Sequence, residues 1–188
     1  MKVLILSTGT GEGHNSAAKA VKEQFDENGI PCVMADALDF ASERAARYGR
    51  NVYVWSTKRG VFGGAYRAGS AITSARHKSP VYYANALYAD KLYAYIVEND
   101  FDTVVMPHLF PAEAVTYMQK KHHLRLASYF IATDYTCIPF TEETSPDYFF
   151  VPHEDLIPEF AGRGIPEEKL IPLGIPVSGR FVELPPIT

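Results

Sequence analysis

The 188-residue sequence has only two cysteines, Cys32 and Cys137, and no apolar run near the length of a membrane-spanning helix. Two cysteines are too few for a disulfide framework, and they lack the spacing of metal ligands. A spanning helix needs about 20 consecutive apolar residues. We therefore expect a protein of the reducing cytoplasm without a metal site. Because a strand begins directly at the N-terminus, we also expect no signal peptide.

Acidic residues are missing from one long stretch, which contains no aspartate or glutamate between Arg44 and Ala89. The stretch is +8, whereas the remainder, with ten basic and all 22 acidic residues, is −12. Aromatic residues are interleaved with the basic ones, as on surfaces that meet anionic lipid headgroups, where each basic residue contributes about 1 kcal/mol. The residues expected to bind the membrane are Arg44, Arg47, Arg50, Trp55, Lys58, Arg59, Phe62, Arg67, Arg76 and Lys78.

This basic and aromatic stretch has two other interpretations. Single-stranded nucleic acid binds grooves of the same composition. A solvated surface whose aromatic rings face the core would also give the pattern. We expect the anionic membrane as the partner and no nucleic acid, which places the protein at the cytoplasmic face of the cell membrane or otherwise in the cytoplasm.

Two common phosphate-binding motifs are absent from the glycine loop at residues 8–14. The loop has no Gly-Lys-Ser/Thr ending, so it is not a P-loop. The dinucleotide motif G-x-G-x-x-G fits at Gly9 and Gly11, but His14 occupies the third glycine position. Asp36, which follows the second expected strand, could still act as the ribose-binding acid of a nicotinamide site.

The loop instead joins an expected strand to an expected helix through a tight turn. Residues 2–7 are apolar and β-branched, which is typical of a buried parallel strand. Glycines at 9, 11 and 13 allow a tight turn and close approach of another group. The loop then places His14 at the carboxyl end of the strand, beside unpaired N–H groups that could face an anion. The simpler alternative is a tight turn with a surface histidine.

Strands and helices alternate along the whole chain, which predicts an α/β fold with a Rossmann-like, doubly wound parallel sheet. In the helix at 80–99 we expect Tyr83, Leu87, Ala94 and Val97 to face the core, because they recur at helical spacing. Residues 50–80 predict short helices and a mobile loop. The expected strands are 2–7, 31–35, 102–106, 126–132, 147–151 and 170–173, and the expected helices are 14–28, 38–49, 80–99, 111–122 and 154–163.

Polar residues follow several of the expected strands. His14 follows the first, and the others are His108, Thr133-Asp134 and His153. Because parallel strands end at one edge of the sheet, these side chains can converge on one site. Each also has a structural alternative, since a histidine after a strand is often a hydrogen-bonded loop residue and an aspartate there is often a helix cap.

Four segments resemble those of one known family, the monogalactosyldiacylglycerol synthases and bacterial processive diacylglycerol glucosyltransferases. They occur in the family's order along nearly the whole chain. The segments are STGTGEGHNSAA at 7–18, FIATDYTCIPF at 130–140, DYFFVPHEDL at 147–156 and RGIPEEKLIPLGIPVSGRF at 163–181.

The resemblance implies the N-terminal half of a GT-B glycosyltransferase, a class in which two Rossmann-like domains face each other across a cleft. Residues 1–176 would be the acceptor domain and 177–188 the start of an interdomain linker, with the C-terminal nucleotide-sugar domain absent. The implied reaction moves a hexose from a UDP-sugar to diacylglycerol or a related lipid with inversion, and the chain alone would be inactive. The alternatives are a lipid-binding module without catalysis, a peptidoglycan-lipid glycosyltransferase domain and a nucleotide-dependent oxidoreductase.

The resemblance also implies roles for individual residues. His14 would be the base that takes the proton of the acceptor hydroxyl, and Asp134 would orient it or act as the base itself. Glu12 departs from what a phosphate-facing loop requires. No cofactor is implied, since the UDP-sugar is a substrate bound mainly by the missing domain. The acceptor or phosphate would contact Gly9, Gly11, Gly13 and His108.

Overall fold

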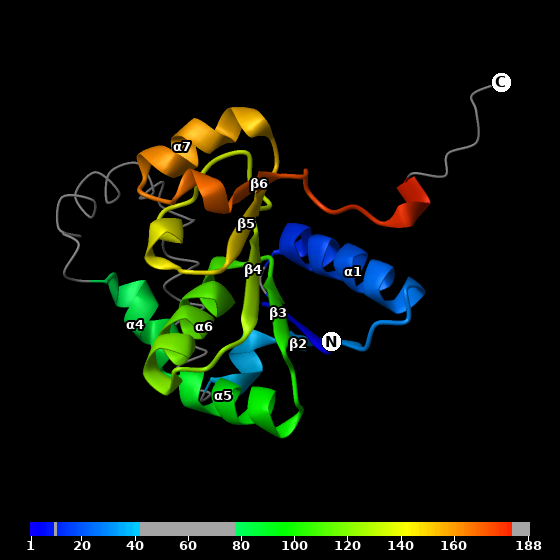
Figure 1. Ribbon diagram of the computed structural model, residues 1–188, viewed down its shortest axis with the longest axis vertical. Coiled ribbons are helices and arrows are strands. Elements are labelled where there is room, and N and C mark those ends of the chain that lie inside the picture. Colours follow the sequence, from blue (N-terminus) through cyan, green and yellow to red (C-terminus); the bar gives the residue numbers. More distant parts are fainter. Residues whose placement is uncertain (10, 42–77, 182–188) are drawn as a thin grey trace.

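A computed structural model of the chain describes residues 1–9, 11–41 and 78–181 (Figure 1). Six strands form one sheet in the order β2-β1-β3-β4-β5-β6, and every neighbouring pair is parallel. The predicted parallel α/β sheet is therefore confirmed. The strands are β1 Val3–Ser7, β2 Cys32–Asp36, β3 Thr103–Met106, β4 Ala127–Ile131, β5 Tyr148–Val151 and β6 Leu170–Pro172.

Helices lie on both faces of the sheet (Figure 1). Helix α1, Glu12–Glu27, lies on one face, and the other described α-helices lie on the opposite face. Those helices are α4 Pro80–Ala86, α5 Ala89–Glu98, α6 Leu109–His122 and α7 Ile157–Gly162. Short 3₁₀ helices occur at Ala37–Phe40, Thr141–Glu143, Glu154–Leu156, Glu167–Lys169 and Gly179–Phe181.

Some expected helices differ in the structure. The start of the helix expected at 38–49 is the 3₁₀ helix Ala37–Phe40, and its remainder lies outside the described residues. The short helices expected within 50–80 also fall almost entirely outside them. In the described part of the chain, no helix is both long enough and apolar enough to span a bilayer.

The interior strand β1 shows why the sheet forms where the sequence predicts it. All five of its residues are buried, so both of its faces contribute to the core. Leu4 and Leu6 pack with the helices α5, α6 and α7, whereas Val3 and Ile5 pack on the side of α1 against Ala18. Each fully buried aliphatic side chain contributes about 1.5–3 kcal/mol. Small alanines on α1 allow the helix to lie close to the sheet.

The helix predicted at 80–99 is two helices, and the prediction of its core face was wrong. α4 ends at Ala86 and α5 begins at Ala89. Leu87 is 74% exposed, and Tyr83, Val97 and Ala94 are exposed as well. The buried residues of this segment are Tyr82, Asn85, Tyr88, Ala89, Leu92 and Ile96.

The buried face of these two helices includes a polar residue, Asn85, that has hydrogen-bond partners. The Asn85 side chain donates to Oε2 of Glu113 on α6 at 2.6 Å, and Tyr88 donates to Oδ1 of Asn85 at 3.2 Å. The Asn85 amide thus has a partner for its nitrogen and for its oxygen, which an apolar pattern does not reveal. Glu113 Oε1 has no hydrogen-bond partner among the residues described.

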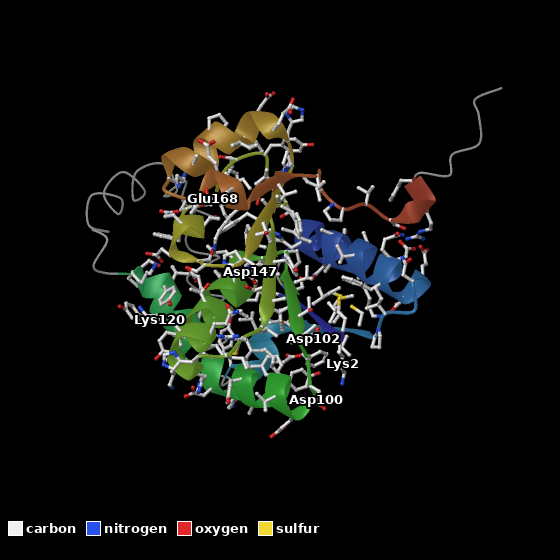
Figure 2. All side chains as sticks on the ribbon, in the orientation of Figure 1. Lys2, Asp100, Asp102, Lys120, Asp147 and Glu168 are labelled. Atoms are coloured by element: carbon white, nitrogen blue, oxygen red, sulfur yellow. The ribbon has the colours of Figure 1, made fainter. Side chains whose placement is uncertain are left out.

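At the amino edge of the sheet, contacts of Asp102 join the starts of two neighbouring strands. Asp102, just before β3, accepts hydrogen bonds from the backbone N–H of Lys2 at 3.2 Å (Figure 2). The terminal ammonium of Met1 also lies 3.5 Å from the Asp102 carboxylate. These contacts tie the starts of β1 and β3 together. The polar groups that could take part in chemistry lie at the opposite, carboxyl edge.

Candidate active site

The candidate site lies where β1, β3 and β4 end side by side. The loop after β1 leads into α1 with His14 in its first turn, β3 is followed by Pro107 and His108, and β4 by Thr133 and Asp134. Pro107, Thr133 and both histidines line one small cavity together with Asp134. The predicted convergence of strand-end residues thus occurs at three of the four strands.

His153, which follows β5, does not join this group. Its Nδ1 accepts a hydrogen bond from the backbone N–H of Asp155 at 3.2 Å, and its side chain is 57% exposed. It therefore caps its own 3₁₀ helix, Glu154–Leu156, as the loop-residue alternative predicts.

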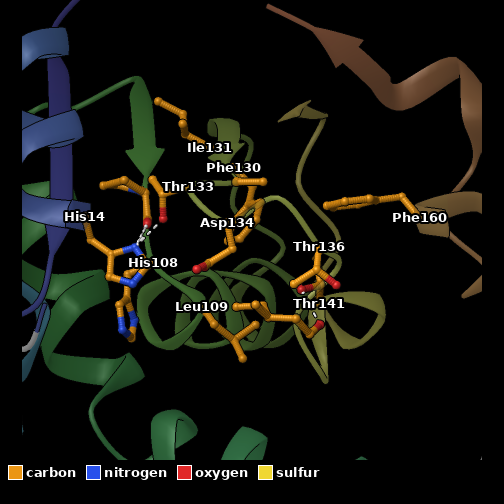
Figure 3. Close-up of a pocket in the computed structure, with 13 residues that line it drawn as sticks. His14, His108, Leu109, Phe130, Ile131, Thr133, Asp134, Thr136, Thr141 and Phe160 are labelled. Atoms are coloured by element: carbon orange, nitrogen blue, oxygen red, sulfur yellow. Dashed lines mark hydrogen bonds between the residues drawn. The ribbon is translucent and has the colours of Figure 1, made fainter. Parts of the chain in front are cut away.

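Two oxygen atoms hold the imidazole ring of His14. Nδ1 lies 2.8 Å from the Pro107 carbonyl oxygen and 2.6 Å from Thr133 Oγ1 (Figure 3). A carbonyl oxygen can only accept, so Nδ1 carries the hydrogen and donates it. In the neutral ring the lone pair is then on Nε2, which can accept a proton. His14 is half-buried.

The three glycines of the loop differ in what they provide. Gly11 has φ +100°, and a Cβ there would lie 2.9 Å from Cδ2 of His14. A Cβ on Gly9 would lie 2.9 Å from Oδ2 of Asp36. Gly13 has open space around it and no left-handed φ. Gly11 and Gly9 are therefore required by close packing, whereas Gly13 is not.

Asp36 has a structural role in this arrangement. Its Oδ1 accepts a hydrogen bond from the backbone N–H of Leu38 at 2.8 Å and caps the 3₁₀ helix Ala37–Phe40. Its other oxygen lies against Gly9. The capping contact accounts for an acid at this position without a nucleotide.

The first turn of α1 directs backbone N–H groups to the same edge. Gly11 precedes the helix and provides no side-chain cap, so the first N–H groups have no partner within the helix. Such an end attracts negative charge. The exposed carboxylate of Glu12 lies in this turn. A negative charge here is what the sequence analysis found unusual for a loop that faces a phosphate. Ser7 Oγ donates to Oδ1 of Asn15 at 2.6 Å and ties β1 to the helix.

His108 is a buried, neutral partner of His14. It is 4% exposed, and its Nδ1 caps α6 by accepting from the backbone N–H of Phe110 at 3.1 Å. Burial, with a smaller effect of the nearby His14, lowers the pKa of His108 to about 3. The two rings meet edge to face with centroids 4.6 Å apart. At neutral pH His108 therefore offers no positive charge to a phosphate, and its assigned contact with acceptor or phosphate stays a prediction.

Asp134 lies at the cavity without touching His14 in any contact of the described residues (Figure 3). It is exposed, and no described helix begins there, so it is not a cap. The loop that carries it is held by Glu159, whose Oε1 accepts from Thr136 Oγ1 at 2.7 Å and from the Cys137 N–H at 2.9 Å. The contacts that orient His14 come from Thr133 and Pro107, which the sequence analysis did not assign to this role.

The cavity at these residues is small. Its volume is about 10 Å³, which is close to the minimum for one water molecule. The cavity is therefore too small to enclose a sugar or a lipid headgroup. In the part of the chain that the structure describes, no group of three or more His, Cys, Asp or Glu side chains could hold a metal ion.

Nine of the ten residues predicted to bind the membrane lie outside the described residues. The tenth, Lys78, has its Nζ 3.0 Å from the backbone carbonyl oxygen of Glu143, to which it donates, and 5.5 Å from the centre of the Tyr82 ring. Membrane binding stays a prediction.

The fold, a six-stranded parallel sheet with helices on both faces, is that of a domain of the GT-B glycosyltransferases. The lipopolysaccharide outer core galactosyltransferase WaaB, in its apo form, has a similar structure, with a TM-score of 0.56 and 11% sequence identity. The similarity covers 93% of this chain and 45% of WaaB, so the chain spans less than half the length of that transferase.

The family model of monogalactosyldiacylglycerol (MGDG) synthase matches residues 14–177, and the chain belongs to this family. No curated protein matches the sequence significantly. Family and fold together make the chain a glycosyltransferase-like domain of glycolipid synthesis. The resemblance noted from four sequence segments is thereby confirmed.

Proposed function

We propose that the chain is the acceptor-binding half of a transferase that moves a hexose from a UDP-sugar to a hydroxyl of diacylglycerol, or of a related lipid, with inversion. The observation that carries the proposal is the placement of His14 at the carboxyl edge of the sheet with its Nε2 unprotonated. A base must lie within hydrogen-bond reach of the hydroxyl it activates. The shallow site suits an acceptor that is presented from a membrane surface.

In the proposed reaction the acceptor oxygen attacks the anomeric carbon of the sugar. A new carbon–oxygen bond forms on one face while the bond to the UDP oxygen breaks on the other, and its electron pair leaves with the diphosphate. The hydroxyl proton passes to Nε2 of His14. The resulting imidazolium keeps its Nδ1–H on the Pro107 carbonyl oxygen, 2.8 Å away. Asp134, at the same cavity, is the alternative base.

The donor and the membrane would be bound by parts of the protein beyond this site. We assign the UDP-sugar mainly to a C-terminal domain outside this chain, with residues 177–188 leading to it, and no cofactor or metal to the reaction. We assign the anionic membrane surface to the acid-free stretch of residues 44–89, which is +8. A lipid-binding module without catalysis is the alternative function.

The test is a pair of histidine variants in the protein that includes the donor domain. His14→Ala should lower the transfer rate by roughly 10²–10⁴, the usual contribution of a general base. His153→Ala is the matched control, because it also follows a strand but caps its own short helix. The same assay with Asp134→Asn separates the two candidate bases. Transfer by His14→Ala at the rate of the control would remove His14 from the mechanism.

A further inference from the structure

Several neighbours limit the movement of the His14 ring. Nδ1 lies between the Pro107 carbonyl oxygen and Thr133 Oγ1, at 2.8 and 2.6 Å. Gly11 packs so closely on Cδ2 that a Cβ would lie 2.9 Å away. The His108 ring meets the imidazole edge to face. These neighbours restrict both the position and the rotation of the ring.

The two oxygens at Nδ1 differ in what they can do. The Pro107 carbonyl oxygen only accepts, whereas a threonine hydroxyl can donate or accept. With the hydrogen on Nδ1, both oxygens accept from it and no lone pairs face each other. The same contacts persist when Nε2 takes up a proton, because the imidazolium retains its Nδ1–H. The ring therefore needs no rotation between the two protonation states.

The alternation of side chains along β4 explains why Thr133 reaches Nδ1 of His14. Side chains alternate along a strand, so Ile131 and Thr133 point to the same face. Ile131 is buried with Ala18 in the core on the side of α1 and pairs with Phe150 of β5. Thr133 continues this row one step past the end of β4, toward the helix that carries His14. Asp134 follows on the other face.

We propose that Thr133 is the positioning residue of His14: together with the Pro107 carbonyl it keeps the proton on Nδ1 and leaves Nε2 to the acceptor. A neutral hydroxyl thus has the role that was expected of the Asp134 carboxylate. The kinetic part of this proposal rests on the proposed function, whereas the protonation of the ring nitrogens can be measured without any reaction.

The first experiment is NMR of the 188-residue chain labelled with ¹⁵N at histidine, at a pH where the His14 ring is neutral. The wild type should show a protonated Nδ1 and an unprotonated Nε2. Thr133→Val has nearly the same shape without the hydroxyl and should shift a measurable fraction of His14 to the Nε2–H form. Thr133→Ser should restore the wild-type spectrum, and it serves as the folded reference if the valine variant is unstable.

Thr136→Val is the matched control, because it removes a hydroxyl from the same loop that bonds to Glu159 and not to His14. Its His14 signals should match the wild type. A proton on Nε2 in the wild type, or an unchanged His14 spectrum in folded Thr133→Val, would overturn the proposal.

The second experiment measures kcat and KM in the protein that includes the donor domain. Thr133→Val should lower kcat by up to about 10²-fold, the effect of a catalytic group misplaced by about 1 Å, with KM changed little. Thr133→Ser should recover most of kcat, and Thr136→Val should retain it. If His14→Ala abolishes transfer while Thr133→Val does not alter kcat, the positioning role is wrong. If His14→Ala is fully active, His14 is not the base of the proposed function, and the NMR result still decides which ring nitrogen carries the proton.

Discussion

Replacing Gly11 by alanine tests the packing around His14 more directly than any other single change. Gly11 has φ +100° and ψ 106°, and the new Cβ would lie 2.9 Å from Cδ2 of His14. Gly13 lies two residues further on, in the first turn of α1, and a Cβ there meets nothing within 4 Å. Comparing Gly11→Ala with Gly13→Ala therefore distinguishes the effect of packing against His14 from the general effect of replacing a glycine in this loop.

The expected magnitudes differ in size and sign. A non-glycine residue in such a backbone conformation costs about 1–3 kcal/mol. The contact with Cδ2 must also be relieved, and the ring of His14 has to move away from Gly11. A shift of about 1 Å in a catalytic group lowers the rate by roughly 10²-fold. Gly13→Ala should be neutral or stabilising by up to about 1 kcal/mol, because alanine favours the helix.

The assay is urea unfolding of the wild type and both variants of the 188-residue chain. A second measurement records the NMR signals of His14 in the folded proteins. Gly11→Ala should unfold at a lower urea concentration and shift the His14 signals, whereas Gly13→Ala should do neither. Transfer assays with the donor domain present should rank the variants in the same order. Equal stability of the two variants, or a greater loss with Gly13→Ala, would refute the packing argument.

The remaining predictions concern pH and the membrane. Burial raises the pKa of Glu113 well above its usual value, so the wild type should lose stability as the pH rises above about 4.3, and Glu113→Gln should remove this loss. Urea unfolding near pH 5 and pH 8 checks this, and parallel curves for the two proteins would contradict it. Burial lowers the pKa of His108 to about 3, so stability should fall by up to about 1.4 kcal/mol per unit as the pH drops below about 6.5. His108→Asn, which can still cap α6, should show a shallower fall, and an equal slope would exclude His108 as its cause. The chain should bind anionic vesicles with partial release at about 0.5 M salt, because screening weakens the exposed charges. Trp55→Ala combined with Phe62→Ala should abolish the salt-resistant remainder, whereas equal binding to neutral vesicles would show that charge is not the cause.

The local pattern was sufficient to predict the sheet and the location of the site. The strands are short apolar runs, and a buried parallel strand needs just such a run, so their expected positions agree with β1–β6 to within one or two residues. Alternation with helices implied parallel pairing, and parallel pairing implied that strand ends share an edge. His14, His108 and Asp134 could therefore be assigned to one site from their positions alone.

The choice between equivalent helical faces required the tertiary structure. Residues 80–99 contain more than one stripe at helical spacing, and the prediction rested on the stripe of Tyr83, Leu87, Ala94 and Val97. The structure buries the stripe with Asn85, because α6 offers Glu113 as a hydrogen-bond partner. Since a polar residue can be buried only where a partner exists, the sequence of the helix alone cannot identify its buried face.

The orientation of His14 also depends on the tertiary structure. Thr133 lies 119 positions from His14 in the sequence, and the two meet only because β4 lies beside β3, which in turn lies beside β1. The different packing at Gly11 and Gly13 follows from this orientation, because only Gly11 lies against the His14 ring. By itself the sequence determined which residues have the chemistry and on which edge they lie. Which atoms touch depends on strand order and register, because these bring distant parts of the chain within hydrogen-bond distance.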